Sequence, residues 1–197
     1  MAEATDTQPR IVEDPGFNQR FSFRRFTDEG GAEVLEVSVW INPGGGVPPH
    51  VHPAMEERFM VQSGRAEFLA GRKWVSAGPG ETVVVPPGTR HAYRNRSDDV
   101  AHFICHARPP STLQEFLEDA AAMSRAGRLM KNGMPKSFDA LAQAAVMVNA
   151  NWDMVELGFP LPPRPLQRLL IPPLARIGER RGYRAGHFAE DLSSSHG

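Results

Sequence analysis

Two stretches decide the fold of this chain of 197 residues: GGGVPPHVHPAMEERFMVQSG (44–64) and GETVVVPPGTRHAYRN (80–95). In both, short β-prone runs lie between glycines and prolines. Gly64, Gly80 and Gly88 supply turn conformations that other residues avoid, and Pro86 favours a turn. The same stretches contain several histidines and glutamates. They therefore predict short strands, joined by tight turns, that bring metal-ligating side chains together.

Further strands are predicted on both sides of these stretches. In 35–41, Leu35, Val37, Val39 and Ile41 alternate with residues of the opposite face, which is the pattern of a half-buried strand. Other short β-prone segments are bounded by glycine, proline or Asn/Asp clusters, and they are 57–62, 66–70, 82–86 and 99–107. Evenly spaced short strands are typical of an antiparallel sandwich or barrel.

The composition changes after Pro109-Pro110, where the chain becomes rich in Ala, Leu and Met. We therefore divide the chain into an N-terminal arm (1–14), a β-barrel domain (15–110), a helical extension (111–190) and a disordered tail (191–197). A capping box from Ser111 to Gln114 predicts a helix that ends near Gly127. The extension must bury its apolar faces against the outer barrel surface, across a dimer interface or as a lid over the barrel mouth.

Two more helices are predicted in the extension. One begins with Ser137 as its N-cap and runs toward Gly158, with Phe138, Leu141, Ala145 and Val148 on one face. The last helix is expected to break or restart at Pro172-Pro173, because proline lacks the backbone donor and clashes with the preceding turn.

Four side chains are candidates for one metal site. His50 and His52 are two residues apart, so on a strand their imidazoles project from the same face. Glu57 follows a short turn and can return on a neighbouring strand, and His91 follows the turn at 86–89. Three imidazoles and one carboxylate suit iron, manganese, nickel, copper, cobalt or zinc, so one divalent transition metal is the expected cofactor.

The ordered set of residues in the two stretches resembles the two-part signature of the cupin superfamily. The matching positions are Gly44, His50, His52, Glu57 and Gly64, then Gly80, Pro86, Pro87, Gly88, His91 and Asn95, and 15 residues separate the two parts. The resemblance covers about residues 30–108. It implies an all-β cupin double-stranded β-helix, or jelly-roll barrel, in a single-domain cupin of the quercetin-dioxygenase-like kind, here with a C-terminal α-helical extension.

The resemblance also implies a role for each candidate ligand. His50, His52, Glu57 and His91 would be the metal ligands. Glu56 competes with Glu57 for the carboxylate position, and Glu57 is preferred because six residues then separate it from Gly64. Cupins are often dimers, so a homodimer is expected.

Strand parity indicates what lines the pocket. Phe59 and Val61 share the face of Glu57, and Tyr93 shares the face of His91, so these three residues are the candidates for substrate binding. Simple core packing would explain them equally well. His102 and His106 share one face of the predicted strand at 99–107 and Cys105 lies on the other, but parity alone does not show which face is inside.

The expected function is a metal-dependent dioxygenase or other oxidoreductase that acts on a small substrate with chelating oxygens, such as an enol, diol or diketone. The alternatives are a non-redox isomerase or lyase that uses the metal as a Lewis acid, and a non-enzymatic binding protein. A net charge of −1 argues against nucleic-acid partners. The start of the chain does not resemble a secretory signal, Cys105 is the single cysteine, and no apolar stretch is long enough to span a membrane. A cytoplasmic protein is therefore expected.

Overall fold

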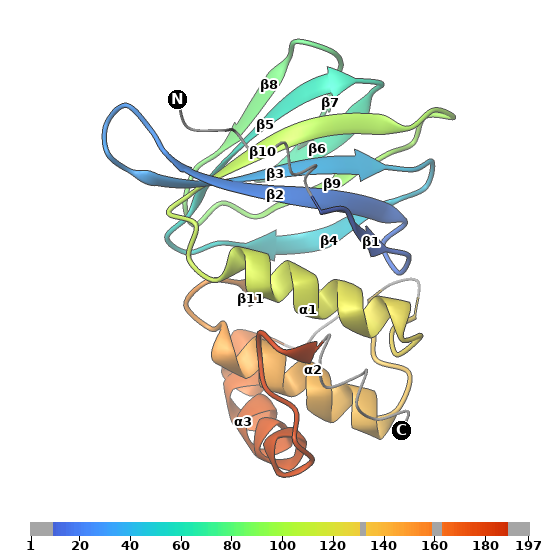
Figure 1. The fold of residues 1–197 in the computed structure, drawn as a ribbon, viewed down its shortest axis with the longest axis vertical. Coiled ribbons are helices and arrows are strands. Elements are labelled where there is room, and N and C mark those ends of the chain that lie inside the picture. The colour runs from blue at the N-terminus through green and yellow to red at the C-terminus, as the bar shows by residue number, and fades with distance from the viewer. Residues whose placement is uncertain (1–9, 131–132, 159–162, 189–197) are drawn as a thin grey trace, which may run out of the picture.

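The protein consists of two antiparallel sheets and three helices in its computed structural model, which describes residues 10–130, 133–158 and 163–188 (Figure 1). The first sheet has the order β1 (Val12–Asp14), β2 (Gln19–Thr27), β3 (Glu33–Ile41), β10 (Ala101–Arg108), β5 (Glu56–Ser63) and β8 (Thr82–Val85). The second has the order β11 (Glu156–Leu157), β4 (Gly46–Val51), β9 (His91–Arg94), β6 (Ala66–Ala70) and β7 (Lys73–Ala77). The helices are α1 (Leu113–Arg125), α2 (Phe138–Ala150) and α3 (Arg164–Arg180).

The predicted fold class is confirmed: the two antiparallel sheets form a β-barrel, and the helices follow it in the chain. Strands lie within or close to each of the five segments in which the sequence predicts them. The domain boundaries stay predictions. The predicted tail at 191–197 and the first nine residues of the predicted arm lie outside the described residues, whereas residues 12–14 form an edge strand on β2.

The barrel core is built from alternate residues of the three central strands of the first sheet. Phe103 on β10 faces Val39 on β3 and Val61 on β5, and all three side chains are buried. Cys105, two residues further along β10, occupies the next inward position. This period of two explains why an alternating sequence pattern identifies the strands.

The helix starts only partly follow the predictions. Ser137 caps α2 as predicted, and its hydroxyl oxygen accepts a hydrogen bond from the Ala140 amide at 3.1 Å. The predicted capping box of α1 is wrong, because its N-cap is Thr112 and no side chain caps the helix. The Thr112 hydroxyl donates instead to the Asn151 side-chain oxygen, so a tertiary contact replaces the local one.

Three further helix predictions are corrected by the structure. Phe138 and Leu141 are 54% and 38% exposed while Ala145 and Val148 are buried, so the predicted apolar face of α2 is wrong, and the helix ends at Ala150 rather than near Gly158. The predicted break at Pro172-Pro173 is also wrong, because both prolines lie inside α3. The carbonyls that these prolines leave without a partner belong to exposed residues at 168 and 169, where water can satisfy them.

The extension packs on one side of the barrel. α1 runs alongside the strands beneath β4 and β1 and packs on β1, while α2 and α3 pack on each other beyond it (Figure 1). β11 follows α2 and pairs with β4, so the extension also adds an edge strand to the second sheet. Of the arrangements expected for the extension, packing against the barrel is observed, with α1 forming one wall of a cavity, and a dimer interface stays a prediction. Within the described part of the chain, the helices lack the length and apolar character needed to cross a membrane.

Candidate metal centre and its cavity

The structure brings His50, His52, Glu57 and His91 together at one end of the barrel interior. One ligand atom from each residue lies within 4.8 Å of all the others. His50 is on β4 and His52 lies just beyond it, whereas Glu57 is the second residue of β5 and His91 is the first residue of β9. The ligands therefore come from both sheets, and the cluster exists only once the barrel has closed.

Each of the three imidazoles has its Nδ1 atom fixed by a backbone carbonyl. His50 Nδ1 donates to the Pro48 oxygen at 2.9 Å, and His91 Nδ1 donates to the Thr89 oxygen at 2.8 Å. His52 Nδ1 donates to the oxygen of Met154 at 2.7 Å, which lies in the extension. Such bonds place the proton on Nδ1 and leave the Nε2 lone pair available to a metal, as in the outer shell of metal-bound histidines.

Nε2 of His91 and Oε2 of Glu57 lie 2.7 Å apart, but the contact does not have hydrogen-bond geometry and the nitrogen is otherwise unpartnered among the described residues. A buried nitrogen and a carboxylate oxygen this close need a proton or a cation between them. The donor set, with three available Nε2 atoms and one carboxylate, therefore fits a divalent transition metal.

The charge states of Glu57, His50 and His52 fit the same role, whereas the neighbouring Glu57 carboxylate outweighs burial and raises the pKa of His91. Burial raises the pKa of Glu57, but the neighbouring imidazoles of His91, His52 and His50 outweigh it and bring the pKa to about 2, so the carboxylate is ionised. Burial and the nearby His91 and His52 lower the pKa of His50 to about 3, and burial lowers that of His52. Both imidazoles are therefore neutral near pH 7, as ligation requires.

The two candidate carboxylates occupy different environments. Glu57 is buried in the cluster, whereas Glu56 is half-buried outside it and lies 3.8 Å from the Arg58 guanidinium. Cys105 also contacts the site, because its thiol donates to Oε1 of Glu57 over 3.7 Å. Burial raises the pKa of Cys105 well above its ordinary value, so the thiol stays protonated.

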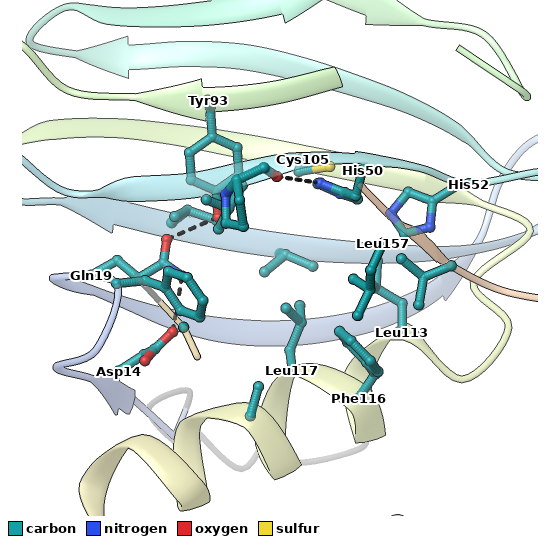
Figure 2. A pocket seen from close by; sticks show the side chains of 18 of the residues that line it. Asp14, Gln19, His50, His52, Tyr93, Cys105, Leu113, Phe116, Leu117 and Leu157 are labelled. Atoms are coloured by element: carbon teal, nitrogen blue, oxygen red, sulfur yellow. Dashed lines mark hydrogen bonds between the residues drawn. The ribbon is translucent and has the colours of Figure 1, made fainter. Parts of the chain in front are cut away.

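A cavity of about 160 Å³ extends from the cluster between the barrel and the extension (Figure 2). Of the predicted pocket residues, Phe59 and Tyr93 line it, whereas Val61 is buried in the core and is outside the lining. Apolar side chains of α1 form one wall, and they are Leu113, Phe116, Leu117, Ala120 and Met123. Most of the lining is apolar, and its size is close to that of a cavity that holds one benzene ring.

The remaining histidines of β10 face away from this cavity. His102 stacks on Trp40 with ring centroids 4.5 Å apart and lies 2.9 Å from the Ser38 hydroxyl. His106 lies 3.0 Å from a carboxylate oxygen of Glu36. Phe103 and Cys105 are thus the inward residues of this strand, and the parity question left open by the sequence is decided.

Two groups that line or support the site were not predicted from the sequence. The Met154 carbonyl is a backbone atom, so no residue type signals its role. Asp14 and Gln19 line the end of the cavity away from the cluster, but Asp14 falls in the predicted arm and Gln19 precedes every predicted strand. Their positions depend on how β1 and β2 pair at the sheet edge.

Residues 37–107 match the family model described as the cupin domain, and this stretch contains all four cluster residues. No curated protein matches the chain. Among solved structures, the polyketide cyclase RemF from Streptomyces resistomycificus is 24% identical, with 56% of this chain and 82% of that chain covered and a TM-score of 0.44. A sugar phosphate isomerase of the cupin superfamily from Silicibacter pomeroyi is 20% identical, with 51% and 71% covered and a TM-score of 0.43.

The cupin domain of an XRE family transcriptional regulator from Enterobacter cloacae is 24% identical, with 47% of this chain and 98% of that chain covered and a TM-score of 0.41. Fold and family match together define the barrel as a cupin domain. Its histidine and glutamate cluster can hold one metal ion. The helical extension lies beyond the matched stretch.

Proposed function

We propose that this protein is a metal-dependent cupin enzyme, a dioxygenase of a small substrate that chelates the metal through enol, diol or diketone oxygens. The observation that carries the proposal is the fixed orientation of three imidazoles, each with Nδ1 bonded to a carbonyl, around an ionised Glu57 at the end of an apolar cavity. His50, His52, Glu57 and His91 would hold the metal.

A divalent ion held by these four residues would supply Lewis acidity and oxygen chemistry, and its net positive charge would favour anionic substrate oxygens. The chain's own contribution is positioning and the exclusion of water. Phe59 and the apolar side chains of α1 surround the space next to the cluster. A low-dielectric wall of this kind strengthens every electrostatic contact of the bound substrate.

The scarcity of proton-transfer groups favours oxidation over the non-redox alternative. Among the described residues that line the cavity, the titratable side chains outside the cluster are Asp14, Tyr93 and Cys105. Burial raises the pKa values of Tyr93 and Cys105 well above their ordinary values, so neither acts as a base near pH 7. Isomerases and lyases need a base near the reacting carbon, and Asp14 is the residue that such a mechanism would require.

Metal content and oxygen consumption test the proposal together. The full chain would be purified without a metal-affinity column, analysed for metals and then assayed for oxygen uptake with catechols and β-diketones. Near-stoichiometric iron, copper, manganese, cobalt or nickel with substrate-dependent oxygen uptake is expected. Turnover without oxygen uptake, or with zinc alone, would support the isomerase or lyase alternative.

Failure to bind any transition metal would overturn the proposal and favour a non-enzymatic binding protein. The homodimer and the cytoplasmic location stay predictions. Equilibrium sedimentation of the same preparation would test the homodimer.

A further inference from the structure

A chain of three polar side chains runs along the cavity from Tyr93, on the strand of His91, to Gln19 and then Asp14, which lie away from the cluster (Figure 2). The Tyr93 hydroxyl donates to Oε1 of Gln19 at 2.9 Å, and Nε2 of Gln19 donates to Oδ2 of Asp14 at 3.1 Å. The direction of these bonds leaves two oxygen atoms with lone pairs that can still accept a hydrogen bond. They are the Tyr93 oxygen and Oδ1 of Asp14.

Asp14 is an unusual residue to find at this place, because it is only 2% exposed and no hydrogen bond of ordinary length and angle reaches its Oδ1 within the described part of the chain. Burial raises the pKa of Asp14, although hydrogen-bonding contacts from Gln19, Ser124 and the backbone amides of Phe17 and Gly16 lower it, and of these the Gln19 bond has ordinary geometry at Oδ2. A buried carboxyl oxygen without a partner costs stability unless a ligand supplies the missing hydrogen bond.

The extension holds this carboxyl group in place. The Gly16 amide donates to the Ser124 hydroxyl oxygen at 2.6 Å, and the Arg125 guanidinium donates to the Glu13 carbonyl at 2.8 Å. Both contacts join the end of α1 to β1 or the turn after it. The orientation of Asp14 is therefore fixed from two sides, by Gln19 of the barrel and by α1.

We propose that Asp14, Gln19 and Tyr93 form a second subsite, which accepts a hydrogen bond from a hydroxyl group at the far end of a substrate whose near end coordinates the metal. This inference rests on the proposed function and names its substrate class. The lining is apolar between the two polar ends, and the volume is close to that of a cavity that holds one benzene molecule. The substrate is thus a compact single-ring or similarly small apolar molecule with chelating oxygens at one end and a hydroxyl at the other.

The test compares benzene-1,2,4-triol with 4-methylcatechol, in which a methyl group replaces the third hydroxyl. Binding of each probe to the zinc-loaded full chain would be measured by calorimetry without oxygen, so that no turnover is needed. The wild type is expected to bind the triol at least about tenfold more tightly, since one buried hydrogen bond is worth about that factor. In D14A and in Y93F the ratio of the two affinities should fall to near one.

Leu117→Ala is the matched control, because Leu117 lines the same cavity without a polar atom. It should weaken both probes alike and leave their ratio unchanged. Y93F removes one oxygen atom and keeps the ring, so it provides the test even where D14A does not fold.

Two results would overturn the inference in different ways. Equal binding of the two probes to the wild type, or an unchanged ratio in Y93F and in folded D14A, would refute the distal subsite and leave the proposed function intact. If neither probe bound the zinc-loaded protein, chelation at the cluster would fail as well, and both proposals would fall together.

Discussion

The barrel and the extension contribute to the cavity in different ways. The barrel supplies all four cluster residues, and the stretch that contains them matches the cupin domain. The extension supplies the apolar wall from α1 and the Met154 carbonyl that fixes His52. The barrel therefore provides the chemistry, whereas the extension shapes the space beside it and also supports one ligand.

The extension is therefore part of the site. The Met154 carbonyl reaches His52 from 102 residues further along the chain. If the two regions were independent, changes in the extension would alter only substrate binding. We expect one change there to alter metal binding too, and the predictions below separate the two effects.

The largest effect is expected from the carboxylate in the barrel. E57Q should lower metal affinity more than about 100-fold, because it removes the one anionic ligand of the cluster. E56Q is the matched control and should bind metal as the wild type does, since Glu56 lies outside the cluster. Titration of both metal-free variants with a competing chelator measures the difference. Equal losses would show that the carboxylate ligand is wrongly assigned.

The second prediction tests the support that the extension gives to His52. Asn151 holds the turn that carries Met154: its carbonyl accepts the amides of Met154 and Val155, and its side chain bonds Thr112 and Met147. N151A should loosen this turn and lower metal affinity by roughly 10-fold, at the lower end of what loss of such outer contacts costs.

N149A is the control for this change, because Asn149 lies at the end of the same helix and bonds the Trp152 indole instead. Metal titration and thermal melting of both variants would be compared. Unchanged metal affinity in a folded N151A protein would mean that the extension does not support the site.

The third prediction concerns the cavity wall. A120L adds volume to the side of α1 that faces the cavity, so it should weaken binding of 4-methylcatechol to the zinc-loaded protein by about 10-fold through steric exclusion. Metal affinity should stay unchanged, since Ala120 lies outside the cluster. Calorimetry with the probe and with zinc separates the two. A change in metal affinity alone would contradict the division between wall and ligands.

The smallest effect is a pH-dependent change in stability. The folded-state pKa of Asp14 is raised, so as pH rises the unfolded chain releases this proton first and the folded state loses stability. D14N should therefore have a melting temperature a few degrees above that of the wild type at pH 7.5. This difference in melting temperature should shrink as pH falls toward 3.8, the ordinary pKa of the carboxyl group. Of the groups that face Asp14, Tyr93 stays neutral in this range.

D119N is the matched control, because Asp119 is equally buried but accepts hydrogen bonds from the amides of Gly186 and Phe188. It should melt below the wild type, since an amide offers only one acceptor oxygen. Thermal melts of the metal-free variants between pH 4 and 7.5 provide the measurement. A D14N protein that is less stable at pH 7.5 would show that the Asp14 carboxylate is satisfied in the folded state.

Sequence by itself determined much of the barrel. Alternation in Leu35, Val37, Val39 and Ile41 identifies a strand because the side-chain period of a strand is fixed at two. The spacing of the histidines and of Glu57 indicated the cluster, because the turns that bring them together are marked by glycines and prolines nearby. These signals are local, so they can be read without the fold.

Only the tertiary structure decided the rest of the site. Helical periodicity predicts Phe138 and Leu141 on a buried face, but the packing of α2 on α3 leaves them exposed. The Met154 carbonyl bonds His52 from just before β11, and the Asp14 carboxyl lines the cavity from β1; both are short edge strands whose positions depend on pairing with distant residues. Contacts between segments far apart in the chain leave no periodic trace in either segment, which is the physical reason why the extension's part in the site could not be predicted.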